Sequence, residues 1–164
     1  MTDKINFTHQ VAACDQRTQQ LLSDAGWFPD RQVDISQDIK ELEAEGYTVF
    51  PSVQRFLLSF NGLDLQWSIF DTRSGRDLHT DVWIDGAAVA GALFSEWRSD
   101  YEAFLGTSVC PIGKAEHGHF TLLMDIRGQV FGVFDELIVL YGETGVQAID
   151  TLVTRRKPVI LREG

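Results

Sequence analysis

The hydrophobic pattern of this chain changes its period abruptly at Asn61-Gly62, and this change constrains the class of fold. Before it, four apolar residues recur at the spacing of one helix face: Val53, Phe56, Leu57 and Phe60. After it, four apolar residues alternate with polar ones, as in a half-buried strand: Leu63, Leu65, Trp67 and Ile69. A helix that begins at Pro51 and leads directly into a strand indicates that helices and strands share one core.

The rest of the chain follows the same mixed pattern. One helix should end at Ala25 with Gly26 as its left-handed stop, and another should begin at Asp34 with Gln37 in the capping-box position. Strands are expected at 78–85, 109–113, 119–125, 129–135 and 137–141, and helices at 95–105 and after Thr144. Successive strands joined by short turns predict a single α+β domain over 1–164, with a mainly antiparallel sheet and helices packed on it.

The charge balance narrows the class of partner. Fourteen Lys and Arg stand against 24 Asp and Glu, which gives a net charge of −10. Such a surface repels nucleic acid and anionic membranes and attracts basic proteins, although acidity can also serve solubility alone. The N-terminus lacks the layout of a signal peptide, and the two cysteines, Cys14 and Cys110, suit a reducing compartment. We therefore expect a cytoplasmic protein.

The chain carries few of the motifs that enzymes use. A Gly-rich phosphate loop, a nucleophile elbow and a Cys-x-x-Cys pair are all missing from the sequence, so we expect no enzyme activity and no cofactor. The alternative is a hydrolase or metal enzyme built on His117 and His119, with Glu116, Asp125 or His79 as further ligands. A polar loop that enters a strand explains the same residues without a metal.

Two acidic surfaces are candidates for binding a partner. The first is the outer face of the helix after Asp34, with the acids Asp38, Glu41, Glu43 and Glu45. The second is the outward face of strand 78–85, where Trp83 is expected among the polar residues His79, Asp81 and Asp85. An exposed Trp among carboxylates has the composition of a hot spot for a basic partner. The alternative is that a helix covers this face and buries Trp83.

Five ordered blocks of the sequence resemble the third subfamily of SUKH immunity proteins. Leu21-Leu22-Ser23-Asp24-Ala25-Gly26-Trp27-Phe28-Pro29-Asp30-Arg31 is similar to the family's "L-L-x-x-A-G-W-x-P-x-R". Phe56-Leu57-Leu58-Ser59-Phe60-Asn61-Gly62-Leu63 is similar to "F-L-x-x-F-G-G-L", with Asn61 in place of the first glycine. Cys110-Pro111-Ile112-Gly113 matches "x-P-I-G", and 122–125 with 128–131 matches the hairpin "L-L-x-D-x-x-G-x-V-(F/Y)". Residues 148–158 are similar to the closing helix and tail.

The resemblance implies a SUKH-like α+β domain with its core at about 19–160. It also implies a cytoplasmic immunity protein of a bacterial polymorphic toxin system, which binds and neutralises a cognate toxin domain, often a nuclease. A regulatory or scaffold protein-binding module of the same fold is the alternative. No catalytic, cofactor-binding or metal residues carry over, because the shared glycines are expected at turns and Trp27 and Phe28 in packing. We expect a monomer or a weak homodimer.

Overall fold

A computed structural model describes residues 6–164 of the chain. The helices in this range are α1 (Phe7–Ala12), α2 (Gln16–Asp24), α3 (Ser36–Ala44), α4 (Pro51–Phe60), α5 (Gly86–Val89), α6 (Ser95–Leu105) and α7 (Gly145–Thr154). The strands are β1 (Asp64–Asp71), β2 (Arg76–Ile84), β3 (Val109–Ala115), β4 (Phe120–Asp125), β5 (Val130–Phe134), β6 (Leu137–Gly142) and β7 (Val159–Arg162). None of these helices is long and apolar enough to cross a membrane.

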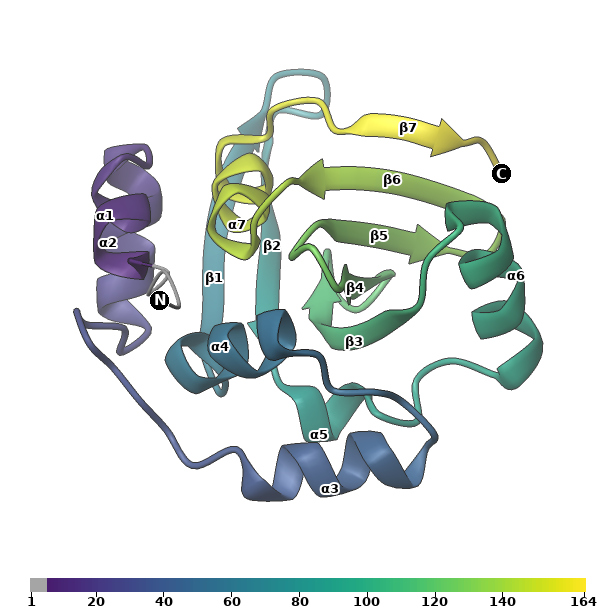
Figure 1. Cartoon of the computed structure of the whole chain (residues 1–164). Coiled ribbons are helices and arrows are strands. Elements are labelled where there is room, and N and C mark those ends of the chain that lie inside the picture. The colour runs from purple at the N-terminus through teal and green to yellow at the C-terminus, as the bar shows by residue number, and fades with distance from the viewer. Residues whose placement is uncertain (1–5) are drawn as a thin grey trace.

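The strands form one seven-stranded sheet in the order β1-β2-β3-β4-β5-β6-β7, and every neighbouring pair is antiparallel. The sheet is strongly twisted, so that the β1–β2 hairpin runs steeply across the direction of β6 and β7 (Figure 1). This arrangement confirms the expected α+β class and the mainly antiparallel sheet.

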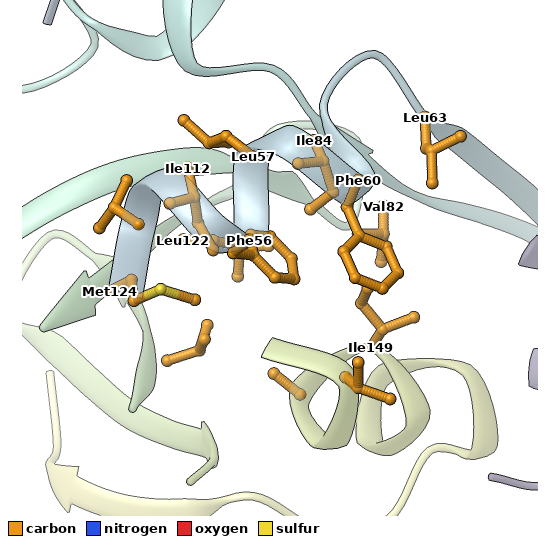
Figure 2. Close-up of a cluster of buried hydrophobic side chains, with 14 of the residues drawn as sticks. Phe56, Leu57, Phe60, Leu63, Val82, Ile84, Ile112, Leu122, Met124 and Ile149 are labelled. Atoms are coloured by element: carbon orange, nitrogen blue, oxygen red, sulfur yellow. The ribbon is translucent and has the colours of Figure 1, made fainter. Parts of the chain in front are cut away.

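Helices cover the two faces of this sheet unequally. On one face, α4 and α7 enclose the main core, to which Phe56, Phe60 and Ile149 contribute together with Leu122 and Met124 of β4 (Figure 2). On the other face, α6 builds a second, smaller core around Tyr101, against residues of β3, β4, β5 and β6. On this second face the side chains that β1 and β2 present remain largely exposed, Gln66, His79 and Trp83 among them. The sheet therefore keeps an open area over β1 and β2.

Most helices and turns begin and end at the residues that the sequence predicts. Helix α4 has Pro51 in its first turn, and the N–H of Gln147 donates to the Thr144 hydroxyl at 3.1 Å to begin α7. Gly106 ends α6 with φ +69°, and Gly128 takes φ +88° in the β4–β5 turn. Such positive φ angles are accessible to glycine at little cost, which is why these turns could be predicted.

Several local expectations were wrong. The capping box does not form, because α3 starts at Ser36 and not directly after Asp34. Asp34 Oδ1 instead accepts from the N–H of Ser36 at 2.9 Å, and the amide of Gln37 donates to Glu41. Phe28 is 57% exposed, whereas Trp27 is buried and stacks on the Phe60 ring. Helix α1 and strand β7 were not expected. Both are short, and neither shows the periodicity that longer elements show.

Candidate protein-binding surfaces

Asp38 lies inside the molecule, which corrects its expected place on the acidic outer face. The residue is only 6% exposed. Its Oδ1 accepts from the amide of Asn61 at 3.0 Å and from the N–H of Ala87 at 2.9 Å, and Asn61 Oδ1 accepts from the N–H of Gly86 at 3.0 Å. Asp38 stands one helical turn before the buried Leu42, so it belongs to the inner stripe of α3. This carboxylate joins α3, α4 and α5 and is unavailable to a partner.

The other three acids are exposed: Glu41 and Glu43 of α3, and Glu45, which directly follows the helix. None of them forms an ion pair within residues 6–164. At about 100° per residue, Glu41 and Glu43 border the exposed face on opposite sides, with Lys40 between them. The face is therefore acidic overall but carries one base near its centre.

Arg98 of α6 fixes the end of α3 from which this acidic face is presented. Its guanidinium carbon lies 3.9 Å from the centroid of the Tyr47 ring. The same group donates to the backbone carbonyls of Glu45 at 3.3 Å and Gly46 at 3.0 Å, and its Nε lies 3.2 Å from a carboxylate oxygen of Glu102. A cation at the carbonyl end of a helix also complements the helix dipole. Helix α3 is thus held against α6 as well as α5.

Trp83 projects from the open area of the sheet, as the alternating pattern of strand 78–85 predicts. It is 36% exposed, whereas its chain neighbours Val82 and Ile84 are buried. Directly across the adjacent strands lie Asp64 of β1 and Lys114 of β3. Trp83 is therefore flanked by one acid and one base, not by acids alone. We call five residues of this area the open face: Asp64, Gln66, His79, Asp81 and Trp83.

The two acids predicted beside Trp83 also hold the backbone in place. Asp81 Oδ1 accepts from the N–H of His117 at 2.8 Å, which fixes the β3–β4 loop against β2. Asp85 Oδ1 accepts from the N–H of Ala88 at 3.0 Å and caps α5. Both residues are only partly exposed. Asp81 therefore belongs to the open face, whereas Asp85 lies at the junction with α5, close to α3.

The histidine motif does not form a site with converging ligands. His117 lies in a turn with φ +59°, so it does not alternate with His119 along a strand. The His117 ring contacts the backbone carbonyl of His79, while His119 packs on the Phe134 ring. In the part of the chain that the structure describes, no group of three or more His, Cys, Asp or Glu side chains could hold a metal ion.

Neither cysteine has the environment of an activated thiol. Burial raises the pKa of Cys110 to about 12. Burial and the nearby carboxylate of Asp150 raise the pKa of Cys14 to about 11. Nucleophilic cysteines require the opposite shift, which nearby cations or a helix N-terminus provide. Both thiols are free, and Cys110 acts as a small core residue.

Comparison with known families assigns the chain to a family. The model of the SUKH-3 immunity protein family matches residues 14–155, a segment that contains every element from α2 to α7. No curated protein and no solved structure matches the chain significantly. The match confirms the family that the five sequence blocks suggested, and it includes both candidate surfaces. This chain belongs to the SUKH-3 immunity protein family.

Proposed function

We propose that this protein neutralises a cognate toxin domain by binding a basic surface on it. Its family supports an immunity role, and the unpaired acidic surface indicates the charge of the target. The chain has 24 acidic residues, yet residues 6–164 contain only three ion pairs, and none of these involves Glu41, Glu43 or Glu45. Uncompensated negative charge raises the local concentration of a basic partner and speeds its encounter.

A nuclease is the toxin class that this charge fits best. Nucleases bind phosphate groups with Lys and Arg, and carboxylates can occupy the same positive groove. Helix α3 presents Glu41, Glu43 and Glu45 on an element that Arg98 holds in place, and Trp83 offers an aromatic anchor on the open face. Such an inhibitor blocks access of the nucleic acid and needs no catalytic group of its own. It has to meet the toxin where nucleic acid lies, so we propose the cytoplasm as its site of action.

The proposal is tested by measuring how tightly the protein binds a candidate toxin domain from a neighbouring gene. The triple variant Glu41→Lys/Glu43→Lys/Glu45→Lys should lower the association rate by at least about tenfold and abolish protection of toxin-expressing cells. A matched variant, Asp24→Lys/Glu136→Lys/Glu143→Lys, makes the same change in net charge at other exposed acids and should retain most of the binding. Trp83→Ala should weaken binding roughly 30-fold, the effect of a hot spot of about 2 kcal/mol.

Two results would contradict the proposal in different ways. If the wild type, the α3 triple variant and Trp83→Ala bind the toxin domain equally well, neither surface is the interface. If the wild type protects against no toxin and instead binds several partners weakly, the alternative of a regulatory or scaffold module is favoured.

A further inference from the structure

Strand β7 forms one edge of the sheet and is unusually apolar for an edge. It pairs with β6 on one side, and no described strand pairs with its other side. Figure 1 shows it as the outermost arrow above β6. Val159, Ile160 and Leu161 are 57%, 46% and 37% exposed. Exposed apolar edges pair readily with further strands, and natural proteins usually protect them with charges, bulges or a covering element.

Grooves on both faces of the sheet extend to this edge. Leu161 lines a groove of about 360 Å³ together with Phe104 and Leu140. Ile160 lines a second groove of about 400 Å³ together with Val139. Because Leu161 and Ile160 are adjacent in a strand, they point to opposite faces of the sheet. A strand added beside β7 would therefore bury apolar surface on both faces as well as pair its backbone groups.

The charges beside β7 differ at its two ends. The exposed bases Arg155 and Lys157 precede the strand, and the exposed Glu163 follows it. Glu136 also lies at the second end, where its backbone carbonyl accepts from Arg162 Nε at 2.6 Å. A basic toxin would meet like charge at the first end. A second copy of β7 in the antiparallel direction would bring the basic end of each strand to the acidic end of the other, which is favourable across strands.

We propose that this protein forms a homodimer through β7, with the two copies of the strand antiparallel about a twofold axis at Ile160. In this register Ile160 lies opposite its own copy, Val159 lies opposite Leu161, and Lys157 lies opposite Glu163. The two seven-stranded sheets then become one continuous sheet, and each copy contributes the same surface, as a twofold contact requires. Since only four residues of each copy form the strand, the interface is small and the dimer is weak.

Sedimentation velocity of the whole protein tests this dimer. Between about 1 µM and about 1 mM, the weight-average mass should rise from that of the 18.5 kDa monomer towards twice that value. Ile160→Lys places two lysines opposite each other at the axis and should keep the protein monomeric. Because Ile160 is exposed, the fold should survive, which circular dichroism would verify. Phe94→Lys is the matched control, since Phe94 is 75% exposed and lies outside β7, and it should dimerise normally.

Charge reversals test the register. Lys157→Glu and Glu163→Lys should each lower the association constant several-fold, because each places like charges opposite one another in both halves of the dimer. A mixture of these two variants should recover association as a heterodimer, because every Glu then faces a Lys. Such recovery requires residue 157 of one copy to lie near residue 163 of the other, as this register places them.

A protein that stays monomeric at about 1 mM overturns the proposal. A dimer that Ile160→Lys does not weaken, or a mixture of the two charge variants that does not recover, overturns it as well. In Figure 1, β7 lies at the opposite end of the molecule from α3. These variants should therefore still bind the toxin domain, and the dimer and the proposed function can fail independently.

Discussion

At the scale of single residues, burial separates Asp38 from the other acids of α3. Asp38→Ala removes the acceptor for the amide of Asn61 and the N–H of Ala87. Losing hydrogen bonds to a buried carboxylate should lower the free energy of unfolding by about 2–3 kcal/mol. Urea denaturation measures this change as a shift in midpoint at constant slope. Glu41→Ala, at an exposed position of the same helix, should change stability by no more than about 0.5 kcal/mol.

Asn61 provides a stricter check on this buried cluster. Its side chain contacts both Asp38 and the N–H of Gly86. In a double-mutant cycle, Asp38→Ala and Asn61→Ala should show a coupling energy of at least about 0.5 kcal/mol. Additive effects of the two substitutions would show that the Asp38–Asn61 contact contributes nothing to stability.

At the scale of helices and strands, the sequence predicted the elements that have one buried and one exposed face. Helix α4 and strand β1 could be predicted because each has one face in the main core, where Phe56 of α4 and Trp67 of β1 are buried. The outward direction of Trp83 follows from the same alternation. Lys114 beside it could not be predicted, because its place depends on the register between β2 and β3. The position of Asp38 was detectable, since its spacing from Leu42 puts both on one stripe.

Gly113 shows a constraint between strands that no local pattern reveals. It was expected as the last residue of strand 109–113, but β3 continues to Ala115. A Cβ atom on Gly113 would come within 2.2 Å of the backbone oxygen of Trp83. Gly113→Ala must open the pairing of β2 and β3 and should destabilise the protein by about 2–3 kcal/mol. Thermal unfolding measures the loss. Gly91→Ala is the control, because the nearest atom to its Cβ is Glu45 Oε1 at 3.8 Å.

A similar loss of stability in Gly113→Ala and Gly91→Ala would show that the close approach at β3 is not the cause. The substitution should also displace Trp83, which lies directly across the β2–β3 pairing from Lys114, and so weaken toxin binding through the open face. Gly91→Ala should leave that binding unchanged.

At the scale of the whole molecule, the acidic surface of α3 and the apolar edge strand β7 lie at opposite ends (Figure 1). Salt should affect binding that depends on the acidic surface. The net charge of −10 acts over distances that salt screens, because the Debye length falls from about 10 Å at 0.1 M to about 3 Å at 1 M. The association rate with the toxin domain, measured by stopped-flow tryptophan fluorescence, should fall roughly tenfold across this range. The dissociation rate should change much less, because contacts already formed exclude most of the salt. An association rate that salt leaves unchanged would mean that the acidic surface of α3 does not guide the encounter, whatever the final affinity.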